Sequence, residues 1–552
     1  MRYVVVTGGV ISGLGKGITT SSIARILKDR GVPLTVVKID PYLNVDAGTM
    51  NPYQHGEVFV LDDGTEVDLD LGNYERFLGE SLPGNHNLTT GKVYRTVIEK
   101  ERRGDYLGNT VQIIPHVTGE VKHMLREAAQ HAQAELTLVE VGGTVGDIES
   151  MPFLEALREL QQEVGGRDHM AFVHTTLVPV VGAVGEAKTK PTQHSVRELR
   201  SLGIQPDMIV ARGPAALTPD LRAKISLFCD VPPEAVIAVP DLPTVYQVPL
   251  HLESQGVGDY LVKRLGIKAL PGDWTSWQRF LEVYAHPQSE VTVGVVGKYV
   301  QLKDAYLSHI EAFHHCQGAL GVGVRLRWFD SEDLLRLPGE RQALEAVDAV
   351  LVPGGYGTRG VEGKILAAEI ARTRGIPFLG ICLGFQLATV EAVRHLLNHP
   401  GANSTEFESA TPHPAITLLD SQAGQAHLGG TQRLGAQTVE VVEGSVLNRL
   451  YGRTKISERH RHRYEVNPAY VDDLSRQGFV VNARSADGRV EGFELTTHPF
   501  YLGVQYHPEF LSRPQSPHVL FLGLVRAGHV RRQGIAVPKE EASHVATPSA
   551  VA

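Results

Sequence analysis

A chain of 552 residues exceeds what one hydrophobic core usually supports, so we expect two large domains that each bury a core. The formal net charge of −9 argues against a general nucleic-acid binder, although local cationic groups can still hold nucleotides. No apolar run approaches the roughly 18 residues of a membrane span. The three cysteines lack metal-site or disulfide spacing, which fits a reducing compartment, so we predict a cytoplasmic protein. From the net charge and the lack of an apolar span we predict that it binds neither nucleic acid nor membrane.

Residues 1–265 alternate short β-branched runs with longer stretches that suit helices. Strand candidates are residues 4–7, 35–39, 136–141 and 208–211. This alternation predicts a parallel sheet with helices on both faces, which is a doubly wound domain. A break at Leu270-Pro271-Gly272-Asp273 is followed by a polar segment that contains tryptophan, and we place a linker over residues 266–288.

A second alternation of strand and helix candidates covers residues 289–530. Its strand candidates are residues 291–296, 349–352, 377–382 and 500–505. The predicted fold class is therefore α/β with two doubly wound domains. Residues 531–552 are rich in Ala, Pro, Glu and Ser without periodicity, so we predict a disordered tail there.

A glycine-rich loop follows the first strand candidate. Residues 7–17 read TGGVISGLGKG and lead into a stretch that suits a helix, residues 18–30. Backbone N–H groups of such a loop can wrap a phosphate, while Lys16 adds a positive charge and the helix N-terminus adds its dipole. Gly17 stands where a phosphate loop usually has Ser or Thr, which leaves Thr19 or Thr20 as alternative metal ligands. The alternative interpretation is a glycine-rich turn without a ligand.

Two acids of the same domain could complete a magnesium centre. Asp70 lies in Asp68-Leu69-Asp70, and Glu140 lies inside an apolar strand candidate, where a carboxylate needs a cation nearby. Lys38 ends another strand candidate, and residues 188–193 (KTKPTQ) add cations and hydroxyls suited to triphosphates. A solvated loop acid and a surface charge run remain the alternative interpretations of Asp70 and of residues 188–193.

Cys382 lies between a strand candidate and a helix candidate, with glycine two residues to either side. Such a turn holds a nucleophile exposed in a strained backbone geometry. His507 and Glu509 follow far downstream, in the spacing that a base and its orienting acid require. A lone cysteine would more often fill a core, but the three residues together predict a catalytic triad.

Residues 1–265 resemble the CTP synthases. The resemblance is carried by residues 7–17, Lys38 to Tyr42 (KIDPY), Gln54 to Val58 (QHGEV), Asp68 to Gly72 (DLDLG), Glu101 to Tyr106 (ERRGDY), Gly142 to Glu149 (GGTVGDIE) and Lys188 to Ser195 (KTKPTQHS). It implies a P-loop-like synthetase domain that binds Mg-ATP, with Asp70 and Glu140 as metal ligands and Lys38 on phosphate. The implied ATP contacts are Gly13, Leu14, Gly15, Lys16, Gly17, Ile18 and Asp70, with Arg212, Asp241 and Leu242 around the base. The implied contacts of UTP or the feedback inhibitor CTP are Ser12, Asp147, Ile148, Glu149, Lys188, Thr189, Lys190, Pro191, Thr192, Gln193 and Lys224.

The C-terminal part resembles the class I glutamine amidotransferases, with Cys382 as nucleophile, His507 as base and Glu509 orienting the histidine. Residues 353–357 (PGGYG) resemble that family's oxyanion loop, where an N–H near Gly355 would stabilise the tetrahedral intermediate. The implied glutamine contacts are Gly355, Leu383, Gly384, Phe385, Gln386, Glu406 and Arg463. Arg463 belongs to a basic run that could instead be a solvated surface.

These resemblances together imply amination of UTP to CTP, driven by ATP, with ammonia from glutamine that travels by an internal path. They also imply activation by GTP, feedback by CTP and a homotetramer. Another amidotransferase-coupled ligase, such as those that amidate cobyrinic acid, would share both half-sites but lack residues 142–149 and 188–195 as they stand here. A nucleotide-binding scaffold without catalysis is the third hypothesis, and the intact predicted triad counts against it.

Overall fold

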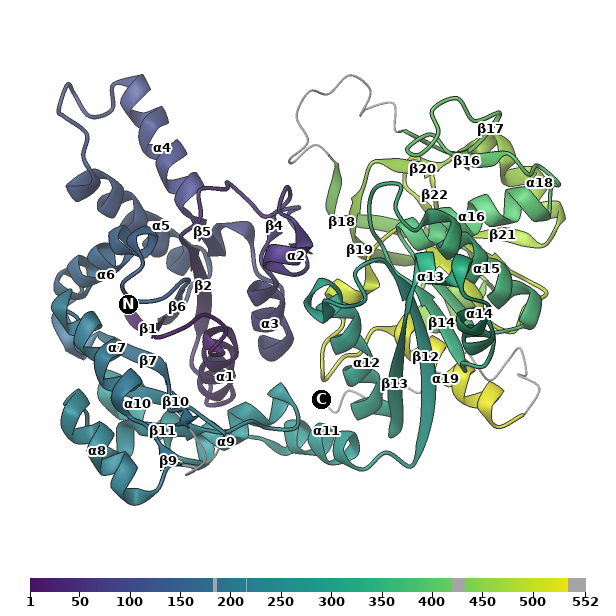
Figure 1. The fold of residues 1–552 in the computed structure, drawn as a ribbon. Helices are drawn as coiled ribbons and strands as arrows, with labels where there is room; N and C mark the ends of the chain where they lie inside the picture. The colour runs from purple at the N-terminus through teal and green to yellow at the C-terminus, as the bar shows by residue number, and fades with distance from the viewer. Residues whose placement is uncertain (182–185, 215, 419–431, 535–552) are drawn as a thin grey trace. The chain divides into compact units, whose positions relative to one another are not determined.

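The computed structural model describes residues 1–181, 186–214, 216–418 and 432–534. The chain forms two compact units, one from Met1–Ala47 with Asp70–Ser276 and the other from Gly48–Leu69 with the chain from Trp277 onward. Each unit has its own large sheet flanked by helices (Figure 1). This arrangement confirms the predicted α/β class with two domains.

The sheet of the first unit has seven strands among the described residues, in the order β11-β10-β7-β1-β6-β2-β5, and every neighbouring pair is parallel. The central strand β1 (Arg2–Gly8) is buried from Tyr3 onward, as expected for a β-branched strand covered on both faces. The other strands are β2 (Leu34–Asp40), β5 (Asn87–Thr89), β6 (Leu136–Val141), β7 (Met170–Leu177), β10 (Met208–Arg212) and β11 (Val236–Val239).

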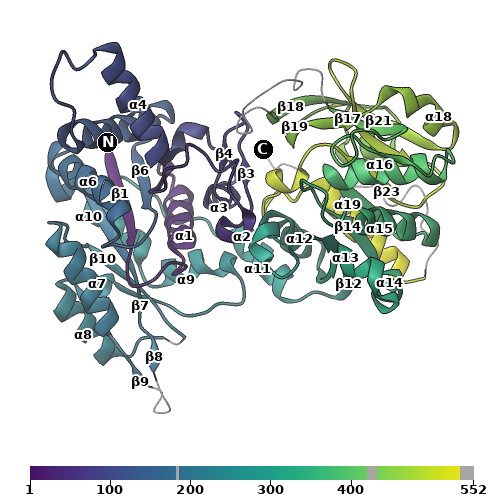
Figure 2. The same cartoon turned by 45° about the horizontal axis from the view of Figure 1, so that its top comes forward.

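Helices lie on both faces of this sheet. Tyr3 and Val5 of β1 share a core with α4, α5 and α6, while α1 packs with α9. Side chains alternate across a strand, so the two helix layers bury opposite faces. A short hairpin of β8 (Val180–Val181) and β9 (Glu186–Ala187) projects beyond β7 (Figure 2). The helices are α1 (Lys16–Asp29), α3 (Leu69–Leu78), α4 (Thr90–Arg103), α5 (Thr118–His131), α6 (Met151–Glu163), α7 (Lys190–Ser201), α8 (Pro219–Cys229), α9 (Val248–Ser254) and α10 (Val257–Leu265).

The sheet of the second unit has nine strands among the described residues, in the order β13-β12-β14-β15-β23-β22-β21-β18-β19. Pairing is parallel from β13 to β23 and antiparallel from β23 to β19. These strands are β12 (Ser289–Gly297), β13 (Val322–Asp330), β14 (Ala349–Val352), β15 (Phe378–Ile381), β18 (Arg433–Val441), β19 (Lys455–His462), β21 (Phe479–Ser485), β22 (Val490–Leu495) and β23 (Tyr501–Val504). A small sheet joins β16 (Ala402–Ser404), β17 (His413–Leu418) and β20 (Tyr464–Val466).

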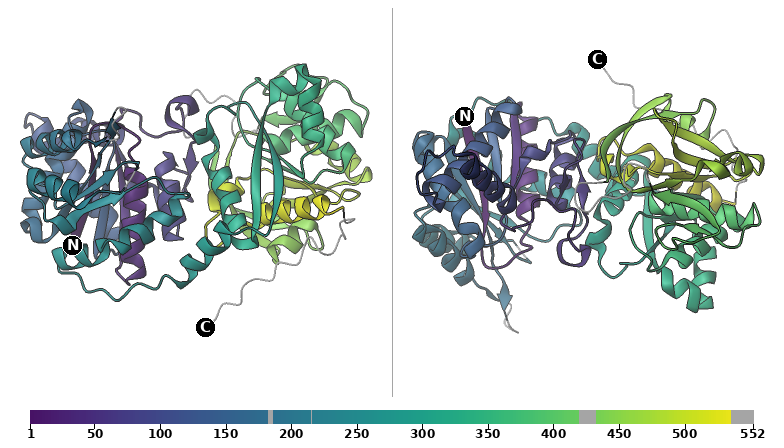
Figure 3. Two further views of the ribbon diagram at one scale, coloured as in Figure 1. Left: turned by 60° about the horizontal axis from the view of Figure 1, so that its bottom comes forward. Right: turned by 90° about the horizontal axis from the view of Figure 1, so that it is seen from above.

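Helices also cover both faces of the second sheet (Figure 3). One apolar core includes α15 and α16, and the other includes α12, α17 and α19. The helices are α11 (Thr275–Ala285), α12 (Leu307–Leu320), α13 (Ser331–Arg336), α14 (Pro338–Glu345), α15 (Val361–Arg374), α16 (Leu383–His395), α17 (Val446–Tyr451), α18 (Val471–Arg476) and α19 (Val519–Arg532). Among the described residues, no helix has both the length and the apolar character needed to cross a membrane.

Residues 48–69 pack with the second unit, although the domain proposed from the sequence includes them in residues 1–265. They contain α2 (Pro52–His55) and the hairpin of β3 (Phe59–Val60) and β4 (Glu66–Val67). Arg459 of β19 pairs with Asp62 at 2.5 Å, and Arg461 pairs with Glu66 at 2.7 Å. Arginines two residues apart on a strand lie on one face, so both can hold the same acidic hairpin.

Two further features differ from the domain limits proposed from the sequence. Helix α11 lies entirely within the segment proposed as a linker, residues 266–288. Arg531 and Arg532, placed in the predicted tail, instead complete α19. Arg531 donates to the carbonyl of Gly375, and Arg532 pairs with Asp348 at 3.1 Å, so both side chains have partners that hold the last turn. The tail residues 535–552 lie outside the described residues.

Candidate active sites

The phosphate-loop candidate joins β1 to α1, as its sequence predicts. Gly13 and Gly15 have φ angles of 76° and 83°, a backbone region that glycine enters at little cost. Lys16 is the first residue of α1, and its Nζ donates to the carbonyl of Gly143 at 2.7 Å. Burial lowers the pKa of Lys16, against the raising effect of the nearby Glu140 carboxylate. The loop therefore presents free helix N–H groups and a lysine at one end of the sheet.

The two predicted metal ligands meet at this loop. A Cβ added to Gly17 would lie 2.3 Å from Asp70 Oδ1 and 3.7 Å from Glu140 Oε2. Lys38 donates to Asp70, and its Nζ lies 3.9 Å from Glu140 Oε1. Burial and the Asp70 charge raise the pKa of Glu140 to about 7. Close approach of Asp70 therefore explains why glycine stands at position 17.

This cluster fits a magnesium ion, because two carboxylates close to a phosphate loop are the donors that Mg²⁺ usually takes. The alternative ligands Thr19 and Thr20 have different surroundings. Thr20 Oγ1 donates to the carbonyl of Lys16 at 2.9 Å within its own helix. Thr19 lines a neighbouring cavity instead. The acids are therefore better placed than either hydroxyl.

A cavity of about 140 Å³ lies beside α1 and collects the residues predicted around the ATP base. Arg212 and Asp241 pair across it at 3.0 Å. The lining also includes Gly15, Ile18 and Leu242. Residues from the phosphate loop, from β10 and from the end of β11 and the segment after it thus share one pocket, which is the size class expected of part of a nucleotide site.

The residues predicted to hold the pyrimidine nucleotide are less completely gathered. Ile148 is 84% exposed, Lys188 pairs with Glu186 at 2.6 Å, and Ser12 and Lys224 are exposed.

Asp147 accepts hydrogen bonds from the N–H and hydroxyl of Thr144, both at 2.6 Å. Thr189 and Pro191 frame the start of α7, where Thr192 Oγ1 donates to the Leu177 carbonyl at 3.1 Å. Glu149 is exposed next to Ile148.

Only two of the residues predicted to hold the pyrimidine nucleotide line the cavity described next. A cavity of about 390 Å³ is lined by Lys190 and Gln193 together with four residues that the sequence reasoning missed: His194, Arg197, Arg200 and Phe228. The signal for two of them was present, because Arg197 and Arg200 follow Gln193 with the i, i+4, i+7 spacing of one helix face. Such a basic face suits a phosphate group.

Cys382 occupies a strained turn between β15 and α16. Its φ is 51° and its ψ is −106°, unusual for a residue with a side chain. A Cβ added to Gly384 would lie 1.9 Å from the Val352 carbonyl oxygen, and one added to Gly380 would lie 2.8 Å from the Gly384 oxygen. The flanking glycines are therefore required by close backbone approach, and the turn holds the thiol in place.

The three residues of the predicted triad lie around one cavity of the second unit. His507 Nδ1 and Glu509 Oε1 are 2.7 Å apart, and Cys382 and His507 line the same cavity of about 300 Å³. Burial alone would lower the pKa of His507, but the charges of Glu509 and Cys382 raise it to about 10. An imidazolium beside a cysteine is the pairing that thiol nucleophiles use.

The predicted oxyanion loop lies against this pair. A Cβ added to Gly354 would lie 2.9 Å from His507 Cε1 and 3.5 Å from Cys382 Cβ. The N–H of Gly357 donates to Glu406 Oε1 at 2.9 Å, which links the loop to one predicted glutamine contact. Gly355 lines the cavity that Cys382 and His507 share.

The remaining predicted glutamine contacts lie at the start of α16 and after β19. Leu383, Gly384 and Phe385 are buried, so Gly384 and Phe385 could reach a ligand only through their backbone. Phe385 packs against Phe493 in the core, with ring centroids 5.9 Å apart. Gln386 donates to the Tyr464 carbonyl at 2.8 Å, close to Arg463 in the chain.

The structure adds residues that the sequence reasoning did not assign to this site. His309 and Arg461 line the cavity together with Gly48 and Glu57 from residues 48–69. His309 Nε2 lies 3.5 Å from Glu509 Oε1, so the carboxylate faces two imidazoles. Glu57 lies in the QHGEV segment and Arg461 in the basic run that contains Arg463, but neither segment indicates a position beside Cys382. These residues reach the site only through the packing of distant segments.

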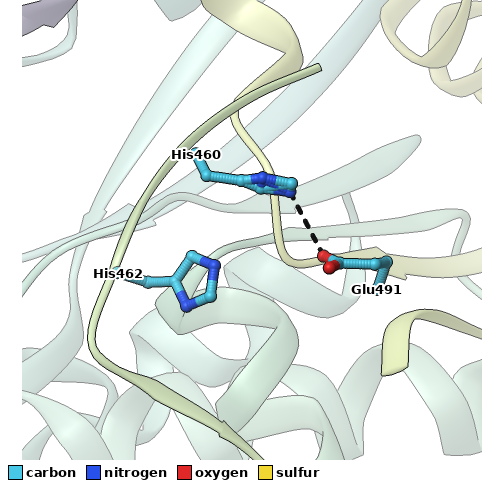
Figure 4. A group of neighbouring side chains, drawn as sticks. All are labelled: His460, His462 and Glu491. Atoms are coloured by element: carbon cyan, nitrogen blue, oxygen red, sulfur yellow. Dashed lines mark hydrogen bonds and ion pairs between the residues drawn. The ribbon is translucent and has the colours of Figure 1, made fainter. Parts of the chain in front are cut away.

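One group among the described residues has the composition of a metal site: His460, His462 and Glu491, all buried (Figure 4). His460 Nε2 lies 3.2 Å from Glu491 Oε2, and His462 Nδ1 lies 3.2 Å from the Tyr464 carbonyl. Arg433 already pairs with the other oxygen of Glu491. A divalent ion would add charge next to this guanidinium, so we interpret the cluster as a buried support for β19 and β22.

Family models match both parts of the chain: "CTP synthase N-terminus" over residues 2–267 and "Glutamine amidotransferase class-I" over residues 301–527. Curated CTP synthases of Methanopyrus kandleri and Thermomicrobium roseum are 56% and 51% identical, over 96% and 100% of this chain and 99% of each relative. A solved glutaminase domain of Trypanosoma brucei CTPS with bound acivicin is 38% identical over 45% of this chain and 97% of its own, with a TM-score of 0.41. The two models define a synthetase domain joined to a class I amidotransferase domain. The chain belongs to the CTP synthase family.

We predict that Gly384→Ala destabilises the second unit. The added methyl would meet the Val352 carbonyl oxygen at 1.9 Å, and overpacking of this kind costs about 1–3 kcal/mol. The midpoint of urea unfolding should therefore fall. An unchanged midpoint would show that the turn adapts, and Gly339→Ala, in α14 with open space around it and no left-handed backbone, controls for a general effect of losing a glycine.

We also predict that Glu509→Gln slows alkylation of Cys382 at pH 7. Without the carboxylate, the pKa of His507 falls from about 10, so the imidazole loses its proton over a wider pH range. The rate with iodoacetamide should fall by about tenfold at pH 7, because burial would then bring the pKa of His507 to about one unit below the solution pH and leave about a tenth of the imidazole protonated. It should approach wild type at high pH. Equal rates at every pH would contradict the proposed ion pair.

Proposed function

We propose that the chain makes CTP by coupling two separate sites, one in each unit. As a member of the CTP synthase family it is a glutamine-hydrolysing ligase that forms CTP from UTP, with ATP as co-substrate. The observation that best supports this proposal is that the residues predicted for each centre lie close together. Lys38 and Asp70 meet Glu140 at the phosphate loop, and Cys382 shares a cavity with His507.

In the synthetase site, ATP is proposed to phosphorylate the O4 oxygen of UTP, because that oxygen is a poor leaving group. Ammonia then displaces phosphate, which gives CTP, ADP and inorganic phosphate. Lys16 and Lys38 would neutralise charge on the transferred phosphoryl group, and the glycine loop would orient it. Mg²⁺ held by Asp70 and Glu140 would supply further charge neutralisation when bound.

In the glutaminase site, Cys382 is proposed to attack the carboxamide carbon of glutamine. His507 holds the thiol proton and delivers it to the departing ammonia, and Glu509 orients the imidazole. The thioester is then hydrolysed by water to glutamate. Residues 48–58 line the cavity next to Cys382, so that cavity is a candidate for the start of the ammonia path. GTP activation, CTP feedback, the homotetramer and a cytoplasmic location stay predictions.

We predict that Asp70→Ala and Glu140→Ala each abolish CTP formation with glutamine and with ammonium salts alike. Both variants remove a proposed magnesium ligand, and neither touches Cys382. Glutamine hydrolysis should therefore persist in both. Near-normal CTP formation at saturating magnesium in either variant, measured by chromatography of the nucleotides, would rule out that metal assignment.

We predict that Cys382→Ala separates the two reactions. CTP formation from glutamine should vanish, because no other described cysteine lines the cavity that holds His507. Formation from ammonium salts should persist and rise with pH as more neutral ammonia becomes available. Lys16→Ala is the matched counterpart and should fail with both nitrogen sources. CTP from glutamine in the Cys382 variant would overturn the two-site proposal.

A further inference from the structure

Lys364 is a buried lysine beside the glutaminase site that the mechanism above does not use. It lies in the first turn of α15 and is 1% exposed. Its Nζ donates to the carbonyl oxygen of Pro353 at 3.2 Å. Pro353 follows directly after β14 and opens the oxyanion loop.

Keeping this ammonium buried is unfavourable. Desolvation and the neighbouring Lys298 ammonium lower the pKa of Lys364 to about 7, although the Cys382 charge acts in the opposite direction. At a helix position that faces a core, a lysine with one hydrogen bond to a carbonyl stabilises the fold less than an apolar side chain of equal length would. A cost of this kind next to an active site points to a functional constraint.

The contact with Pro353 controls a peptide plane next to the nucleophile. A trans peptide unit is planar, so the carbonyl of Pro353 and the N–H of Gly354 point in opposite directions and turn together. Gly354 is the residue whose added Cβ would lie 2.9 Å from His507 Cε1 and 3.5 Å from Cys382 Cβ. The Lys364 Nζ is also 3.7 Å from the position of a Cβ on Gly355. Rotation of this plane would therefore redirect the N–H groups beside the thiol.

The far end of the loop is held in the same way by a second lysine. Lys298 of the segment after β12 donates to the carbonyl of Tyr356, and the N–H of Gly357 in the same peptide unit donates to Glu406 at 2.9 Å. Both ends of the loop thus have a carbonyl turned toward a buried ammonium. Glycines at positions 354 and 355 give the loop little stiffness of its own, so external contacts must set its shape.

We propose that Lys364 is a positioning residue for glutamine hydrolysis: by holding the Pro353 carbonyl, it keeps the oxyanion loop aimed at the intermediate formed on Cys382. The proposal rests on the glutaminase site proposed above. Lys364 acts through the Pro353 carbonyl and takes no part in bond making or breaking. Its effect belongs to the transition state, where negative charge develops on the former carboxamide oxygen.

The test uses the full chain with Lys364→Met, which keeps the length of the side chain but removes its charge and its donor. Loss of one oxyanion-hole donor costs about 100- to 1,000-fold, so misaiming the loop should lower kcat for glutamine hydrolysis by about 10- to 100-fold, with KM changed by less than about threefold. The Tm should stay equal or rise, because an unfavourable buried charge is removed. Ammonium-dependent CTP formation should be unchanged.

Alkylation separates an effect on the loop from an effect on the thiol. Reaction of Cys382 with iodoacetamide forms no tetrahedral oxyanion, so its limiting rate at high pH should match wild type in Lys364→Met. Lys364→Arg, which retains a donor and a charge, should recover kcat to within about threefold of wild type if the contact is what matters. Lys364→Gln is too short to reach Pro353, should show the same fall as Met, and decides the matter if the Met variant does not fold.

Two controls make the outcomes distinct. Arg372 lies on the same helix and pairs with the buried Glu391 at 2.6 Å, so Arg372→Met should lower Tm without changing kcat per folded enzyme. Cys382→Ala must abolish glutamine hydrolysis; if it does not, the proposed glutaminase site itself fails. If it does, an unchanged kcat in Lys364→Met, or an equal fall in kcat and in the limiting alkylation rate, overturns the role proposed for Lys364.

Discussion

Parallel strand pairing brings the distant segments of this chain to two small regions. In the first unit, β6 pairs with β2 so that Lys38 is the direct neighbour of Glu140, and with β1 just before the phosphate loop begins. In the second unit, β15 lies between β14 and β23, with Val352 paired to Gly380 and Gly380 paired to Gly503. Since parallel strands end at the same edge, the segments that follow them must meet there.

The same constraint explains why local motifs were sufficient to predict much of both sites. The phosphate loop follows β1, and the thiol turn follows β15, as the sequence pattern indicates. The parallel sheets follow from β-branched runs that alternate with helical stretches. His507 and Glu509 are also in contact, because two residues of one short segment stay close together in any fold.

Other features depend on packing that no local pattern records. In the sequence, Gly17 is a departure from a standard phosphate loop. The structure gives the reason, because a Cβ at this position would meet the Asp70 carboxylate. Residues 48–69 read as part of the N-terminal domain, but arginines of β19 more than 390 residues away hold the acidic hairpin. Lys364 reads as an ordinary surface lysine in a helix until its burial is seen. Each of these depends on a long-range contact, which a sequence window does not contain.

Both sites hold charged groups whose pKa values burial has displaced, and this has a consequence for stability. The folded-state pKa of Glu140 is raised from 4.5 to about 7. This group therefore contributes its full stabilisation of the folded protein below pH 4.5, and the contribution is lost as pH rises toward 7. The folded-state pKa of Lys364 is displaced in the opposite direction, from 10.5 to about 7, so its contribution to stability is present above pH 10.5 and is lost as pH falls toward 7.

At neutral pH, therefore, neither centre is at an electrostatic optimum in the ligand-free protein. In the proposed synthetase site, a bound cation between Asp70 and Glu140 would favour the ionised carboxylates and remove this cost. In the glutaminase site, negative charge on the intermediate would do the same for the lysines that hold the loop. The ligand or intermediate then supplies the charge that the folded chain lacks, which makes binding and transition-state stabilisation stronger than in a site already neutral. Replacing Lys364 by an apolar side chain of similar length would remove the cost of its burial and weaken the proposed chemistry, which is the trade-off expected of a residue retained for function.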